Sequence, residues 1–207
     1  VKDRESVIKN LSIVLKKDPA ECIGKSREVF RSFGLYLVDF FRMPKFTKSE
    51  MAKRVKVEGL ENLDSVLKRN KGAIALSCHI GNWEMGGVVA AMLGYNISAV
   101  ALTHRHKNIN DFFVKQREEN GLKVIAVNSV MKRCVSTLFD NGILALVGDR
   151  DFTNSGVIMD FFGVPTSLPK GPAVLSLKTG AAVVPTFFVR EGKTNYRFIF
   201  DKPIEII

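Results

Sequence analysis

A histidine and a glutamate lie five positions apart in the stretch SCHIGNWEMGG, residues 77–87. Histidine is the commonest general base in enzymes, and a nearby carboxylate can fix its tautomer and stabilise its protonated form. A spacing of five does not place two side chains on one face of a helix. Glu84 therefore reaches His79 only if the chain turns at Gly81–Asn82. On this interpretation His79 removes a proton from a substrate hydroxyl while Glu84 orients its imidazole.

The same residues also have a purely structural interpretation. His79 can hydrogen-bond a strand terminus, and Glu84 can be the favourable anion in the first turn of a helix that begins near Trp83. In both cases the backbone N–H groups near Gly81 and Asn82 are donors suited to an oxyanion or a phosphate. The pattern alone leaves both interpretations open.

The elements that would position His79 alternate between strands and helices. Apolar runs of strand length occupy residues 71–79, 96–102, 122–127, 142–148 and 181–189. Between them are helix-like stretches at 83–93, 108–119, 130–140 and 169–179. This alternation predicts an α/β fold with a mainly parallel central sheet flanked by helices. Such sheets carry reactive groups at the carboxyl ends of their strands, where both His79 and Asp149 fall.

The two ends of the chain differ from this pattern. Residues 3–17 read as an amphipathic helix broken by Asp18–Pro19, and 25–43 as a more apolar helix ending before Pro44. The aromatic residues of segment 30–46, Tyr36 among them, fit either a core-packed helix or a membrane-interface or acyl-lining surface. The basic run that follows, 45–56, is either a solvated face or a site of attraction for anionic lipid. Residues 195–202, NYRFIFDK, predict a final edge strand.

The charge balance is basic, with 31 Lys and Arg against 21 Asp and Glu and a net charge of +10. This excess favours phosphates, anionic lipid headgroups or an acidic carrier protein as partners. It also fits a non-catalytic α/β module that binds nucleic acid or a phosphorylated ligand. Cys22, Cys78 and Cys134 are odd in number and lack disulfide or zinc spacing, which favours a reducing compartment. No run reaches the roughly 18 to 20 apolar residues of a membrane span.

His104 and His106 invite a zinc site together with His79. No carboxylate or cysteine follows them at ligand spacing, and strand-end histidines usually cap a strand or face solvent. We therefore expect no metal.

Residues 79–84, HIGNWE, resemble the His-(four residues)-Asp/Glu motif of glycerolipid acyltransferases. The form His-x-x-Asn-Trp-Glu is that of the bacterial lipid A biosynthesis acyltransferases, the lauroyl and myristoyl transferase family. Residues 57–87 are similar to the first helix, first strand and motif of that family, and 160–200 to its downstream block. The resemblance implies a glycerol-3-phosphate acyltransferase-like fold that transfers an acyl chain from acyl-carrier protein or acyl-CoA to a hydroxyl of a lipid A precursor or related glycolipid. It further implies an anionic membrane surface at the cytoplasmic face of the bacterial inner membrane, with neither nucleic acid nor a cofactor.

The resemblance also assigns residues. It makes His79 and Glu84 catalytic and gives Arg117, Asp149, Asn82 and Gly81 to substrate binding. By local pattern alone, Arg117 is more simply a helix-surface cation, and Asp149 fits a strand-end helix or turn cap as well as it fits the site. Arg150 stands where the family usually has Gln, which affects local substrate contacts.

We expect one acyltransferase domain over 1–207, with 1–56 an N-terminal helical, membrane-facing segment and 57–207 the catalytic core. The resemblance implies that the family's N-terminal hydrophobic anchor and its C-terminal part are missing from this chain.

Overall fold

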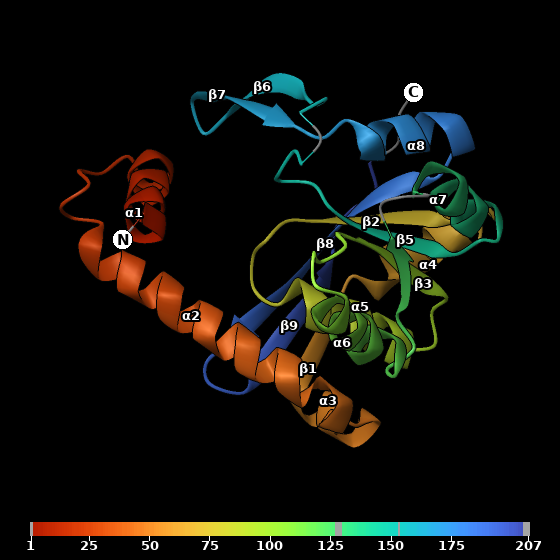
Figure 1. Ribbon diagram of the computed structural model, residues 1–207. Coiled ribbons are helices and arrows are strands. Elements are labelled where there is room, and N and C mark those ends of the chain that lie inside the picture. The colour runs from red at the N-terminus through yellow and green to blue at the C-terminus, as the bar shows by residue number, and fades with distance from the viewer. Residues whose placement is uncertain (1, 127–129, 153, 205–207) are drawn as a thin grey trace.

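The computed structural model describes residues 2–126, 130–152 and 154–204, and its centre is a seven-stranded sheet (Figure 1). The strand order is β1-β9-β8-β2-β5-β3-β4, and a separate two-stranded hairpin pairs β6 with β7. Within the seven-stranded sheet, five of the six neighbouring pairs of described strands are parallel, and β8 and β9 run antiparallel. The prediction of an α/β fold with a mainly parallel, helix-flanked sheet is confirmed.

The bounds of β2, β3, β4, β5 and β8 follow the predicted apolar runs closely, whereas β1 was not predicted. The strands are β1 Val55–Glu58, β2 Ala73–Ser77, β3 Ile97–Ala101, β4 Lys123–Ala126, β5 Ile143–Val147, β6 Val157–Phe161, β7 Val164–Leu168, β8 Ala182–Glu191 and β9 Asn195–Phe200. The helices are α1 Lys2–Leu15, α2 Ile23–Arg42, α3 Lys48–Arg54, α4 Leu60–Leu67, α5 Trp83–Met92, α6 Lys107–Glu118, α7 Val130–Phe139 and α8 Gly171–Thr179, with a 3₁₀ turn η1 at Met43–Lys45.

Two apolar clusters lie on the two faces of the sheet. On one face Val88 and Val89 of α5 pack with Leu63 of α4 and Phe40 of α2. On the other face Cys134 and Leu138 of α7 and Leu175 of α8 pack on Ile74 and Leu144. Because both faces are covered, β2 and β5 are apolar almost throughout rather than alternating, and β3 differs only by the buried Ser98.

The N-terminal helices meet the sheet at one end only. Phe40 and Met43 at the end of α2 are fully buried, whereas Phe30 and Phe33 earlier in the helix are 43% and 52% exposed. Helix α1 packs on α2, and both begin away from the sheet at the left of Figure 1. Core packing therefore holds for Phe40 and Met43 of the 30–46 segment, whereas a membrane-interface or acyl-lining role for its exposed aromatic side chains stays a prediction.

Two expectations about strands were wrong or incomplete. The strand over 195–202 is not at the edge, because β1 pairs with β9 in register from Val55–Tyr196 to Glu58–Ile199. A four-residue strand more than 130 positions away gives no local signal of that pairing. The hairpin β6–β7 was not predicted, and all five residues of β6 are exposed. Residue 127, the end of one predicted strand, lies outside the described residues.

Candidate active site

The loop after β2 fixes His79 through its glycine and asparagine. Gly81 has φ +64°, and a Cβ there would lie 2.1 Å from the carbonyl oxygen of Phe188, so a side chain is excluded. The next residue, Asn82, donates its backbone N–H to that same carbonyl at 2.8 Å. Its side chain accepts from the backbone N–H of Met85 at 3.1 Å and so caps α5. The turn that the sequence predicted at Gly81–Asn82 is thus present, held against β8.

His79 is paired with Asp149. The Nδ1 atom of His79 lies 2.7 Å from Oδ1 of Asp149, and the backbone N–H of His79 donates to Oδ2 at 2.9 Å. Strands β2 and β5 are parallel with Ser77 opposite Val147, and each residue of the pair lies two positions beyond its strand. The register of two neighbouring strands therefore brings together side chains 70 positions apart. Both side chains remain partly exposed, at 36% and 26%.

Glu84 does not pair with His79, in contrast to the arrangement expected from the sequence. Its carboxylate accepts two hydrogen bonds from Arg117 of α6, at 2.7 Å from Nε and 2.6 Å from Nη2. The two side chains are only 9% and 11% exposed, and a carboxylate buried to this extent requires a charged partner. The guanidinium fork of Arg117 supplies it bidentately. The orientation predicted for Glu84 is therefore wrong, because Asp149 already occupies Nδ1 of His79.

The charge of Glu84 affects two neighbouring groups. Burial acts against the charged guanidinium of Arg117, but the hydrogen bonds and charge of Glu84 outweigh it and raise the pKa of Arg117. Burial, followed by the Glu84 charge, raises the pKa of Tyr36 far above its ordinary value. Arg117 thus stays charged and Tyr36 stays a neutral phenol at every pH at which the protein would be assayed.

An aromatic row connects His79 to α2. The imidazole meets the ring of Trp83 edge-on at 4.7 Å between centroids, and Trp83 stacks on Tyr36 at 4.8 Å. Tyr36 comes from α2, so the N-terminal segment contributes directly to the surroundings of His79. No motif around Tyr36 predicted this role.

A cavity of about 790 Å³ opens beside these residues. His79, Trp83, Glu84 and Arg117 line it at the carboxyl edge of the sheet, and the walls behind them are mostly apolar. The lining that the structure describes does not include Gly81 or Asn82, whose contacts are with Phe188, Met85 and α2. Their predicted contact with substrate stays a prediction, whereas their effect on the loop is visible.

The histidines of the zinc hypothesis do not come together around an ion. His104 lies over the ring of Phe113 at 4.4 Å, and His106 precedes the first turn of α6. Among residues 2–126, 130–152 and 154–204, no three His, Cys, Asp or Glu side chains are grouped closely enough to hold a metal ion.

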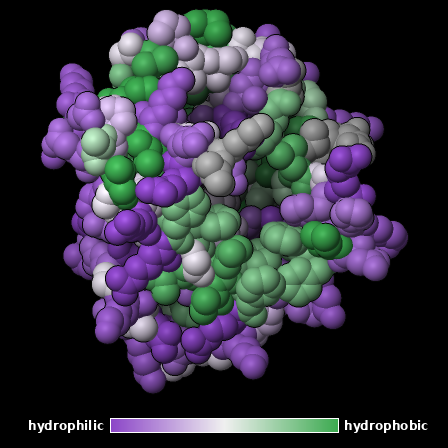
Figure 2. All heavy atoms as spheres, turned by 60° about the vertical axis from the view of Figure 1, so that its left-hand side comes forward, coloured by the Kyte–Doolittle hydropathy of each residue, from purple (hydrophilic) through white to green (hydrophobic). Residues whose placement is uncertain are grey.

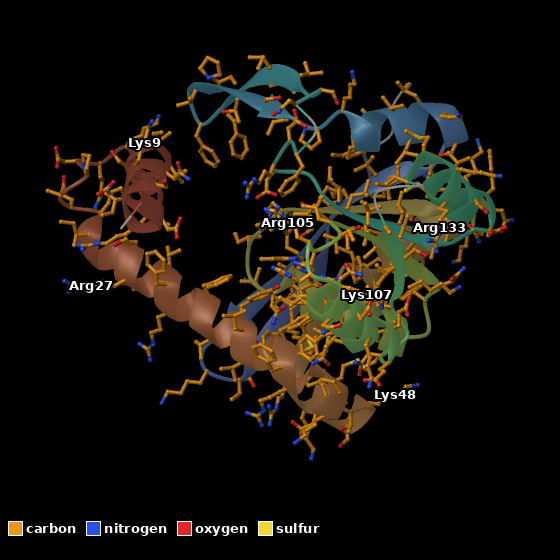
Figure 3. All side chains as sticks on the ribbon, in the orientation of Figure 1. Lys9, Arg27, Lys48, Arg105, Lys107 and Arg133 are labelled. Atoms are coloured by element: carbon orange, nitrogen blue, oxygen red, sulfur yellow. The ribbon has the colours of Figure 1, made fainter. Side chains whose placement is uncertain are left out.

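Basic residues are spread around the molecule. Figure 3 shows Lys9 on α1, Arg27 on α2, Lys48 on α3 and Arg133 on α7, well separated from one another. These four cations do not form one face of the kind expected in a nucleic-acid-binding module.

Comparison with known proteins bears on what this site does. A family model described as bacterial lipid A biosynthesis acyltransferase matches residues 1–206. This chain belongs to that family. It is 31% identical over 201 residues to a phosphatidylinositol mannoside acyltransferase of Mycobacterium tuberculosis, which covers 91% of this chain and 62% of the relative. The corresponding protein of Mycolicibacterium smegmatis is 32% identical over 193 residues, covering 91% and 64%.

A third relative is named for lipid A biosynthesis. The lipid A biosynthesis palmitoleoyltransferase of Escherichia coli is 27% identical over 210 residues, covering 99% of this chain and 68% of that protein. The chain spans less than two thirds of the length of the two mycobacterial relatives. In the described part of the chain, no helix is both long enough and apolar enough to cross a bilayer.

Proposed function

We propose that this protein is an O-acyltransferase that moves a fatty acyl chain from acyl-carrier protein or acyl-CoA to a hydroxyl of a membrane glycolipid. The observation that carries the proposal is His79, paired with Asp149 and lining a largely apolar cavity, in a chain of this family. The acceptor is a lipid A precursor or a related glycolipid, because relatives of both names match nearly all of this chain.

His79 is the general base in this proposal. Asp149 holds Nδ1, which fixes the tautomer and leaves Nε2 to take the proton of the acceptor hydroxyl. The hydroxyl oxygen then forms a bond to the thioester carbonyl carbon, and the carbon–sulfur bond breaks. The departing thiolate takes up the proton from the imidazolium. Asp149, and not Glu84, is the group that orients His79.

The developing oxyanion requires donors close to His79. The backbone N–H of Asn82 already donates to the carbonyl of Phe188. The backbone N–H groups of Gly81 and Trp83 are therefore the candidate donors to the oxyanion in this stretch. Arg117 and Glu84 form a rigid charged wall beside the reacting atoms, and through it Arg117 positions the acceptor. Because all protein groups in this scheme are side chains and backbone amides, it requires no cofactor beyond the acyl donor.

The protein acts at a membrane surface in this proposal, at the cytoplasmic face of the inner membrane. Apolar side chains are exposed on α2, including Phe33 and Phe41, and on the hairpin β6–β7, including Ile158 and Phe162. Both elements lie toward the left of Figure 1, and Figure 2, which brings that side forward, shows apolar side chains bordering a hollow. The net charge of the whole chain is +10, so a membrane of anionic lipid would attract the protein while these apolar side chains enter its surface.

Acyl transfer by the purified protein tests the function. We expect labelled acyl chains from acyl-CoA or acyl-carrier protein to appear in a glycolipid acceptor and to be released as ester on alkaline hydrolysis. Transfer to water alone, with free fatty acid as the product in the presence of either acceptor class, would contradict the proposal.

Vesicle flotation tests the membrane surface separately. The protein should bind anionic vesicles, and binding should fall as salt screens the attraction. Replacing Phe33 and Phe41 by Ser should weaken it, whereas replacing the buried Phe40 would only disturb the fold. Equal, salt-independent binding to neutral vesicles would count against the anionic surface.

A further inference from the structure

The cavity beside His79 draws its walls from both faces of the sheet. Side chains alternate along a strand, so neighbouring residues of one strand face opposite sides. On β3 both Ala99 and Val100 line the cavity, and on β5 both Ala145 and Leu146 do. The cavity therefore passes around the carboxyl edge of the sheet and has two arms.

The first, which we call the α5-side arm, is the closed one. Its walls are Ala90, Ile97, Ala99, Leu122, Ile143 and Ala145. The innermost of these, Ile97 and Ile143, are 3% and 1% exposed. Since Val147 and Ile143 both line the cavity, this arm runs the length of β5, about 13 Å at roughly 3.3 Å per strand residue. The alanines of β3 and β5 leave the room that larger side chains would fill.

The second, which we call the α7–α8 arm, is open at its outer end. Its walls are Val100, Met131, Cys134, Leu146, Val174 and Leu175. Met131 and Val174 are 45% and 39% exposed, so a chain in this arm can continue out to the surface. Burial raises the pKa of the Cys134 thiol to about 11, so this wall is uncharged at neutral pH. His79, Arg150 and Asp151 are among the polar residues of the lining.

We propose that the protein holds two acyl chains at once, one on each face of its sheet. The chain to be transferred occupies the closed α5-side arm, and an acyl chain that the acceptor lipid already carries occupies the open α7–α8 arm. The assignment follows from the two ends: a closed arm limits the length of its occupant, whereas an open arm does not. The inference rests on the proposed acyl transfer, and it adds that the acceptor is recognised by a lipid tail as well as by its headgroup.

Binding stoichiometry tests the two arms without any need for turnover. In native mass spectrometry with palmitate as the probe, the wild-type chain should bind two molecules. Val174→Trp should bind one, because the indole fills the α7–α8 arm. Leu177→Trp is the matched control on the same helix; Leu177 is 65% exposed and outside the described lining, so two should bind. One palmitate on the wild type, or equal stoichiometry in both variants, would overturn the proposal.

Steady-state kinetics then assigns each arm. Val174→Trp should raise KM for an acylated acceptor about tenfold, since each buried methylene contributes substantially to binding, and should leave the deacylated acceptor and the preferred donor length unchanged. Ala99→Leu should shorten the preferred chain in a series of acyl-CoA donors with no change in acceptor KM. Ala145→Val is the milder alternative if Ala99→Leu does not fold.

Two outcomes would contradict either the assignment of the arms or the proposed function. A Val174→Trp enzyme with altered donor-length preference, or with raised KM for donors of every length, would show that the donor occupies both arms. Two bound palmitates with no transfer to any glycolipid would refute the proposed function while leaving the two arms standing.

Discussion

Two acid–base pairs lie at the same edge of the sheet and differ in almost every physical respect. His79 and Asp149 are joined by one side-chain hydrogen bond and are about a third exposed, whereas Glu84 and Arg117 are joined by two and are nearly buried. The first pair can exchange a proton with a ligand in the cavity. The second is a fixed ion pair, because separating it would leave a charge in the protein interior. In the proposed mechanism the two ends of one six-residue motif thus have different roles, His79 as the general base and Glu84 as part of the cavity wall.

Removing the histidine should have the largest effect. His79→Ala should lower turnover by on the order of a hundredfold to ten-thousandfold, the usual worth of a positioned general base, with the circular dichroism spectrum unchanged. His106→Ala is the control, since His106 is exposed at the start of α6. A folded His79→Ala enzyme with near-wild-type turnover would return His79 to the role of a strand-end cap.

Asp149→Asn should come next. It keeps the size of the side chain but loses the charge that stabilises protonated imidazole, so turnover should fall by on the order of a hundredfold. The double variant with His79→Ala should be little worse than His79→Ala alone, because residues that act as a unit are not additive. If the losses of turnover in this double-mutant cycle were additive, Asp149 would act independently of His79.

Glu84→Gln should act on stability first. The substitution leaves Arg117 buried without its anion, which should lower the free energy of unfolding by about 3–5 kcal/mol in urea titrations. Replacing Glu84 and Arg117 together by Gln and Met should recover much of that loss. A Glu84→Gln protein as stable as the wild type but without activity would contradict the structural role of the Glu84–Arg117 pair. Glu84 would then be a catalytic residue.

Tyr36→Phe should have the smallest effect. Because the pKa of Tyr36 is raised far above its ordinary value, its phenol is protonated in both the acidic and alkaline limbs of an assay. Its ionisation leaves the free energy of unfolding unchanged below the ordinary pKa of tyrosine; above that value the unfolded state loses the proton that the folded state keeps, so stability falls as the pH rises. The pH–rate profile of Tyr36→Phe should therefore overlay that of the wild type, and loss of an alkaline limb would show that Tyr36 titrates in the working range.

The sequence predicted the elements better than their pairing. Apolar runs and helical periodicity placed β2, β5 and α5 within a few residues, because these signals are local. The His79–Asp149 contact could not be predicted from these local signals. It depends on β5 being the neighbour of β2, with Ser77 in register with Val147. The Glu84–Arg117 pair was missed for the same reason: nothing near Glu84 indicates that α6 packs beside it.

Asp39 of α2 carries a consequence for the order of folding. Its carboxylate accepts hydrogen bonds from Asn82 in the His79 loop at 3.2 Å and from Tyr196 at 2.7 Å, and it pairs with Arg190. Arg190 and Tyr196 belong to β8 and β9, about 150 residues further along the chain. Helix α2 precedes β8 and β9 in the chain, so its contacts with Trp83 and Phe113 can form before those strands are synthesised, whereas the hydrogen bonds of Asp39 to Arg190 and Tyr196 cannot. The polar anchor of this helix therefore depends on long-range pairing, which forms slowly.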